Sequence, residues 1–224
     1  MLRASAPFRR HPRNSGFQGI PLDMPERPLH DADRGYLTPT NKPFRMYGLI
    51  NRSIKELVLR HHGEGMWTRI AQRAGCGDTE FLGMESYPDE LTYDLVGAAS
   101  AELNVEPAAL LEAFGRHWVL HSAPASYGDL MALTGSSVEE FLGNLDMLHD
   151  RVANILPALR PPEFRSAVQP DGSILLTYIT HRPGLAPIVV GMVNGLGERF
   201  GRSLRIEHVE RREDTGTHDL FRIV

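Results

Sequence analysis

The sequence predicts an α+β domain in which helices come first and a small antiparallel sheet follows. From Met46 to about Leu156, apolar residues recur at the three- and four-residue steps of a helix. After Pro161 and Pro162 the pattern changes to short runs bounded by turn residues, which is typical of strands. Because helices and strands are segregated along the chain, the pattern argues against a doubly wound parallel sheet.

The first 45 residues contain many Pro, Arg and Gly and show no apolar periodicity. Such a segment buries too little apolar surface to offset the entropy of ordering it. We therefore expect residues 1–45 to be a disordered extension or the product of a misassigned start codon, with the folded domain over residues 46–224. The basic stretch up to Leu22 also resembles a transit peptide, although it lacks the apolar core of a secretory signal.

The helical half opens with apolar residues at helical spacing, followed by Gly63 as a stop. Further helices are expected over Trp67–Ala74, Leu91–Leu103, Pro107–Phe114, Gly128–Leu133 and Val138–Ile155. Ser137 and Glu140 have the spacing of a capping box at the start of the last one.

The second half reads as two hairpins with a helix between them. The expected strands are FRSAV and ILLTYITH around the turn QPDGS, then LRIEHVE and HDLFRIV around REDTGT. The intervening segment, LAPIVVGMVNGLGERF, has a helical pattern. These segments predict a sheet of about four strands with one helix packed on it.

Composition limits the partners and the compartment. With 224 residues, 42% of them hydrophobic, and a net charge of -4, the chain can bury one sizeable core, and nothing in its charge indicates nucleic acid or a membrane surface as a partner. The longest apolar run, LAPIVVGMV, is far shorter than the roughly 18 to 20 residues that cross a bilayer. The single cysteine, Cys76, rules out an internal disulfide and favours a reducing, cytoplasmic location.

Other chemical patterns are weak. His117 and His121 have the i, i+4 spacing of a zinc pair, but no H-E-x-x-H arrangement surrounds them, so we expect exposed polar positions. Gly195-x-Gly197 lies within a helical pattern and lacks the preceding strand and third glycine of a nucleotide-binding loop. No catalytic set of side chains has a familiar spacing, so the sequence does not indicate an enzyme.

His149 stands out because it interrupts an apolar helix face. Leu142, Leu145, His149, Val152 and Leu156 follow one another at steps of three and four. A histidine there is neutral and needs a partner, because burial disfavours its charge. One interpretation is a core histidine bonded to a backbone carbonyl; the other is a metal ligand.

About thirty residues later, Tyr178, Thr180 and Arg182 alternate along an expected strand and so point to one face. Two hydroxyls and a planar guanidinium suit the two carboxylates of a porphyrin. A solvated strand face is the ordinary alternative. Together with His149, however, the cluster suggests an anchored haem.

The stretches FLGNLDMLHDRVANILPALRPPEF and LLTYITHRPGLAPIVVGMV resemble the haem domain called H-NOX or HNOB, and the similarity runs from about Met46 to the C-terminus. The resemblance implies haem b between the two halves, with His149 as the proximal ligand and Tyr178, Thr180 and Arg182 as the clamp on the propionates. Thr180 stands where the family usually has serine. The remaining site residues that it implies are Pro162, Leu145, Phe114, Ile50, Trp118 and Ile188.

Ile50, Trp118 and Ile188 are expected opposite His149, with Phe114 and Leu145 as apolar wall and Pro162 against the haem. Family members that retain dioxygen have a tyrosine where this chain has Ile188, so the resemblance favours a sensor for NO.

The chain ends at Val224, so we expect a stand-alone sensor that acts on a separate histidine kinase or cyclic-di-GMP enzyme. A haem enzyme or carrier that reacts with oxygen, peroxide or nitrite is the alternative. A haem-free binding module of similar fold is a third possibility.

Overall fold

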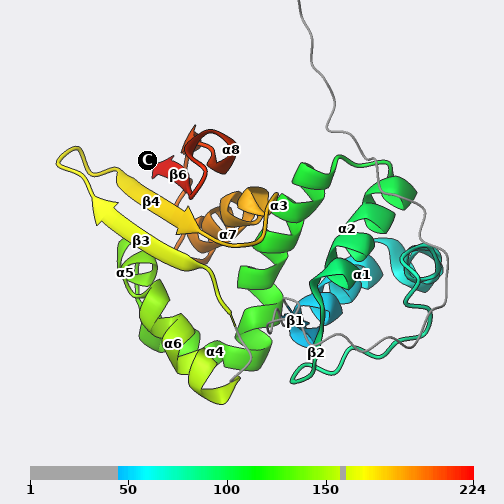
Figure 1. The fold of residues 1–224 in the computed structure, drawn as a ribbon. Coiled ribbons are helices and arrows are strands. Elements are labelled where there is room, and N and C mark those ends of the chain that lie inside the picture. Colours follow the sequence, from blue (N-terminus) through cyan, green and yellow to red (C-terminus); the bar gives the residue numbers. More distant parts are fainter. Residues whose placement is uncertain (1–44, 157–159) are drawn as a thin grey trace, which may run out of the picture. The chain divides into compact units, whose positions relative to one another are not determined.

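The computed structural model describes residues 45–156 and 160–224 (Figure 1). The predicted extension therefore lies outside the described residues except for Arg45, which opens the first strand. As predicted, helices occupy the first part of the domain and a four-stranded antiparallel sheet the second. Among the described residues, no helix combines the length and apolar character needed to span a bilayer.

The first part holds six α-helices, one π-helix and a two-stranded ribbon. The ribbon pairs β1 (Arg45–Tyr47) with β2 (Ser86–Pro88). The helices are α1 (Gly48–Arg73), α2 (Asp89–Leu103), α3 (Pro107–His117), the π-helix (Trp118–Ser122), α4 (Ala123–Thr134), α5 (Val138–Gly143) and α6 (Leu145–Ile155).

One helix boundary agrees with its prediction and another does not. The predicted stop at Gly63 is confirmed, because α1 consists of two helices that meet there in a kink: Gly63 has a non-helical backbone with φ 74°, a positive value that glycine adopts without steric cost. The expected single helix over residues 138–155 is broken at Asn144, whose side-chain amide donates to the Thr134 carbonyl at 2.8 Å. Half of the predicted capping box forms: the Glu140 amide donates to the Ser137 hydroxyl at 3.2 Å, whereas the Glu140 carboxylate accepts from Ser136.

The sheet has the strand order β3-β4-β6-β5. Its strands are β3 (Glu163–Val168), β4 (Ile174–Ile179), β5 (Ile206–Glu210) and β6 (Asp219–Ile223), with α7 (Ala186–Arg199) and the short α8 (Arg212–Thr215) between them. Both predicted hairpins form, and β4 pairs with β6 to join them. Alternate β4 residues, Ile174, Leu176 and Tyr178, are buried in the core shared with α7.

Helices α3 and α7 connect the helical part to the sheet by a close approach of their backbones (Figure 1). A Cβ added to Gly115 would lie 2.2 Å from the Ile188 carbonyl oxygen, and one added to Gly191 would lie 1.9 Å from that of Glu112. Only glycine permits this separation. The contact fixes Ile188 of α7 beside Phe114 of α3, at the wall of the site described next.

Candidate functional site

A mostly apolar cavity of about 250 Å³ lies between the helical part and the sheet. All ten residues that the sequence predicted for the site line it, and they come from segments up to 138 positions apart, from Ile50 to Ile188. The face predicted around His149 is also realised: Leu142, Leu145, Val152 and Leu156 line the same cavity although the helix is broken at Asn144.

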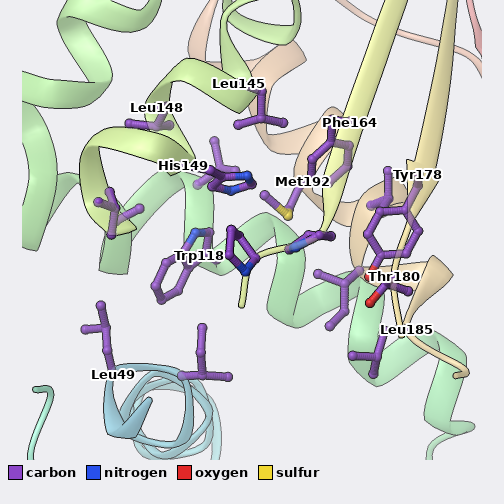
Figure 2. A pocket seen from close by; sticks show the side chains of 18 of the residues that line it. Leu49, Trp118, Leu145, Leu148, His149, Phe164, Tyr178, Thr180, Leu185 and Met192 are labelled. Carbon is purple, nitrogen blue, oxygen red and sulfur yellow. The ribbon is translucent and has the colours of Figure 1, made fainter. Parts of the chain in front are cut away.

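His149 projects from α6 into the cavity, with Leu145 and Leu148 beside it and Leu49 on the opposite side (Figure 2). Its Nδ1 atom is buried and makes no hydrogen bond to any described residue. Burial lowers the pKa of His149, and the Asp146 carboxylate and the Pro162 backbone only partly oppose that shift. The side chain is therefore a neutral imidazole with one buried ring nitrogen that no described residue satisfies.

Aromatic rings form one wall between His149 and the polar end of the cavity. The ring of Phe164 lies 5.7 Å from that of His149 and 5.2 Å from that of Tyr178, measured between centroids. Phe164 was not among the predicted site residues. Its alternation with the exposed Glu163 and Arg165 was the available sign that it points inward.

Tyr178 and Thr180 lie together at the polar end of the cavity (Figure 2). Strand β4 ends at Ile179, so Thr180 and Arg182 follow the strand rather than belong to it, yet all three side chains are buried and line the cavity. Burial raises the pKa of Tyr178 to about 12. Its hydroxyl therefore remains protonated and can donate to an anion.

Arg182 is held by the protein itself. Its Nε donates to Asp89 Oδ2 at 2.7 Å and its Nη2 to Asp89 Oδ1 at 3.3 Å. Its Nη1 donates to the Arg160 carbonyl at 3.0 Å, and Nη2 also to the Arg45 carbonyl at 3.1 Å. The sequence prediction contained none of these partners, because nothing local marks contacts over 22 to 137 residues.

Another wall of the cavity is apolar. Ile50, Phe114, Trp118 and Ile188 gather beside Ile54 and Leu57 of α1. Trp118 opens the π-helix, an irregularity that often occurs at functional sites. Pro162 and the preceding proline line the cavity close to α6.

Of the pair His117 and His121, His121 is exposed as predicted, whereas His117 is not. His117 is 5% exposed rather than a surface position, and its Nε2 has no hydrogen-bond partner among the described residues. Its ring centroid lies 4.9 Å from that of His121. Within the described ranges, no three His, Cys, Asp or Glu side chains form a metal-binding group.

These features fit a haem. A flat, apolar porphyrin with two carboxylates matches an apolar cavity that has hydroxyl and guanidinium groups at one end, and its iron matches the unsatisfied imidazole of His149. Fold and site together indicate a cofactor-binding domain.

Comparison with known proteins also points to a haem-binding domain. A family model described as Haem-NO-binding (HNOB) matches residues 47–208. The chain belongs to this family of H-NOX haem-based gas-sensor domains.

Among curated proteins, the chain is 34% identical over 191 residues to soluble guanylate cyclase gcy-32 of Caenorhabditis elegans and 32% identical to gcy-34 of the same organism. Each match covers 80% of this chain and 28% of the relative, so the chain spans little more than a quarter of these relatives.

The fold is similar to that of an H-NOX protein from S. oneidensis solved in the Fe(II)NO state, with a TM-score of 0.73, 19% identity, and coverage of 80% of this chain and 98% of that one. A mutant H-NOX protein from K. algicida, solved as unliganded Fe(II), gives a TM-score of 0.68 at 24% identity, with coverage of 80% and 95%.

Proposed function

We propose that this chain binds haem b in the cavity, with His149 as the ligand of ferrous iron, and that it senses NO. One observation carries the proposal: a neutral imidazole with an unsatisfied buried nitrogen lines the same apolar cavity as Tyr178, Thr180 and Arg182. A core histidine that served only packing would have both ring nitrogens satisfied, whereas His149, although hydrogen-bonded to the Pro162 backbone, keeps a buried Nδ1 without a partner among the described residues.

The residues have separate tasks. When bound, the haem supplies an iron atom that takes up a diatomic gas. His149, kept neutral by burial, donates a nitrogen lone pair to that iron. The hydroxyls of Tyr178 and Thr180 donate hydrogen bonds toward the propionates, and Arg182 adds positive charge at the same end.

The apolar residues of the cavity determine which diatomic gas is retained. Retention of dioxygen by a bound haem would require a hydrogen-bond donor from the protein, whereas retention of NO would not. Ile188 offers no donor at the position where oxygen-binding relatives have a tyrosine. Trp118, whose indole N–H is a donor, lines the cavity and is the residue through which this selectivity could fail.

Helix α6 links the cavity to the sheet. Asp146, one turn before His149, accepts a hydrogen bond from the Phe164 amide of β3 at 2.9 Å. The resemblance implies that a bound gas would alter how His149 holds the haem, and α6, which carries His149, would pass that change to β3 through Asp146. A local change at the ligand thereby biases two packings of the helical part against the sheet.

The family resemblance extends the proposal to the signalling partner. We infer a separate effector of the histidine kinase or cyclic-di-GMP enzyme class, and a cytoplasmic location.

An absorption spectrum of the purified protein tests the proposal. We expect a Soret band after haem loading, and a shift of that band when NO is added to the reduced protein. Protein that stays colourless after reconstitution contradicts haem binding. Stable dioxygen binding by the reduced protein contradicts the NO selectivity, and turnover of peroxide would instead support the enzyme alternative.

A further inference from the structure

Two histidines that the proposed function does not use lie on either side of Trp118 in the sequence. His117 is the last residue of α3, and His121 lies within the π-helix. Their ring centroids are 4.9 Å apart. Two imidazoles bound to one tetrahedral metal ion, each with a metal–nitrogen distance of about 2.0 to 2.1 Å, have ring centres about 5 Å apart. The two rings therefore already have the separation that a shared ion requires.

His117 has a ring nitrogen that no described residue satisfies. Its side chain is only 5% exposed, and its buried Nε2 atom makes no hydrogen bond within the part of the chain that the structure describes. Buried polar atoms usually have a partner, because leaving one unsatisfied costs free energy. His121 is exposed, so its ring can turn to admit an ion from solvent, and that ion would take the Nε2 lone pair of His117.

Both imidazoles are neutral near pH 7, as histidine ligands of a metal must be. Burial, followed by the charges of His121, Arg60 and His61, lowers the pKa of His117 to about 4. Burial, followed by Arg60, Arg116 and His61, also lowers the pKa of His121. Neither nitrogen pair has to lose a proton before an ion binds.

The surroundings limit how strongly an ion is held. Arg116 forms an ion pair with Glu198, so its charge is matched, but Arg60 opposes a cation. Within the described ranges, no set of three His, Cys, Asp or Glu side chains is arranged to hold a metal. A site made by His117 and His121 therefore has two protein ligands and leaves its other positions to water.

We propose that His117 and His121 chelate a divalent transition-metal ion. Imidazole suits Zn²⁺, Cu²⁺ and Ni²⁺, whereas Mg²⁺ and Ca²⁺ prefer oxygen ligands. Because the two ligands flank Trp118, which lines the cavity, the ion would join the end of α3 to the π-helix beside the proposed haem site. The inference does not depend on haem binding.

Calorimetric titration of the full chain with Zn²⁺ at neutral pH tests the site. We expect His121→Gln to bind the ion at least about tenfold more weakly than wild type, because two linked ligands hold it far better than either one alone. This position is exposed, so the substitution leaves the core intact. The matched control is His62→Gln, an exposed histidine of α1, which should bind zinc as wild type does. Wild type that binds no zinc, or His121→Gln with full affinity, overturns the inference.

The variant His149→Gly excludes zinc binding in the large cavity. His149 also has a buried nitrogen without a partner among the described residues, so it is the competing place for the ion. We expect His149→Gly to keep the zinc affinity of wild type. If His149→Gly loses the ion while His121→Gln retains it, the ion lies in the cavity and the inference is wrong.

Electron paramagnetic resonance of the Cu²⁺-loaded chain examines the ligands directly. Wild type should show coupling to two imidazole nitrogens, and His121→Gln to no more than one. Coupling to fewer than two in wild type contradicts the pair. A chain that binds zinc at this pair but takes up no haem would overturn only the proposed function.

Discussion

Arg182 and Asp89 form a bidentate ion pair across 93 positions of the sequence, with nitrogen–oxygen distances of 2.7 and 3.3 Å. The pair joins the first residue of α2 to the segment that leaves β4. Both side chains are buried, so each charge depends on the other for its stability.

Removing one partner should therefore destabilise the haem-free protein. For Arg182→Gln or Asp89→Asn we expect a loss of about 3 to 5 kcal/mol in the free energy of unfolding, because an uncompensated charge or an unmatched donor set remains buried. Urea denaturation measures it. The control is Arg165→Gln, which breaks the exposed pair with Glu163 and should cost no more than about 1 kcal/mol. Equal effects of the buried and the exposed changes would disprove the structural role.

Much of the fold was predictable because its signals are local. The change from helical to strand pattern after Pro162, the two hairpins and the helix between them all follow from spacing and turn residues. The break at Asn144 was not predictable, because it involves a hydrogen bond from the Asn144 side chain to the Thr134 carbonyl at the end of α4, ten residues earlier. The ribbon of β1 and β2 was also missed, since each strand has only three residues.

For the site, the resemblance supplied the set of residues, and the structure brings them to one cavity. What the sequence could not supply is how they are bonded. Arg182 was expected to face carboxylates of a ligand, but its partner in the structure is Asp89, and such a long-range contact leaves no local pattern.

Gly191 tests the close packing of α3 and α7. A methyl group there would meet the Glu112 carbonyl oxygen at 1.9 Å, so Gly191→Ala must separate the helices. We expect the free energy of unfolding to fall by about 1 to 3 kcal/mol, the usual cost of overpacking. Gly97→Ala in α2 is the matched control, since no atom lies within 4 Å of its added Cβ, and alanine should be neutral or slightly stabilising there. Unchanged stability of Gly191→Ala contradicts the described helix contact.

The buried His117 should make the free energy of unfolding depend on pH. Burial, followed by the nearby His121, Arg60 and His61, lowers the pKa of His117 from 6.5 to about 4. Between these values the unfolded chain binds a proton that the folded chain does not, so stability falls as the pH decreases from about 6.5 toward 4.

The variant His117→Gln should weaken that dependence, as measured by urea midpoints at several pH values across this range. His62→Gln, at an exposed position, should leave the wild-type slope unchanged. If His117→Gln keeps the full slope, the buried histidine is not its source.

Substitutions of Ile188 test the selectivity for NO over dioxygen. Ile188→Tyr places a hydroxyl donor at the apolar side of the cavity, where it can stabilise bound dioxygen. We expect the reduced variant to form a dioxygen complex that the wild type does not form, visible by absorption in air-saturated buffer. Ile188→Phe, which adds the ring without the hydroxyl, should not form it. If neither variant binds dioxygen, Trp118 or the cavity shape controls selectivity instead.

The central claim is that the imidazole of His149 coordinates the haem iron. The most direct measurement is the absorption spectrum of the reduced, haem-reconstituted His149→Gly variant, recorded with and without added imidazole beside wild type and His62→Gly. We predict that only the His149 variant loses haem or its ferrous ligand spectrum, and that imidazole restores both. A His149→Gly protein with wild-type haem content and an unchanged ferrous spectrum would contradict the assignment.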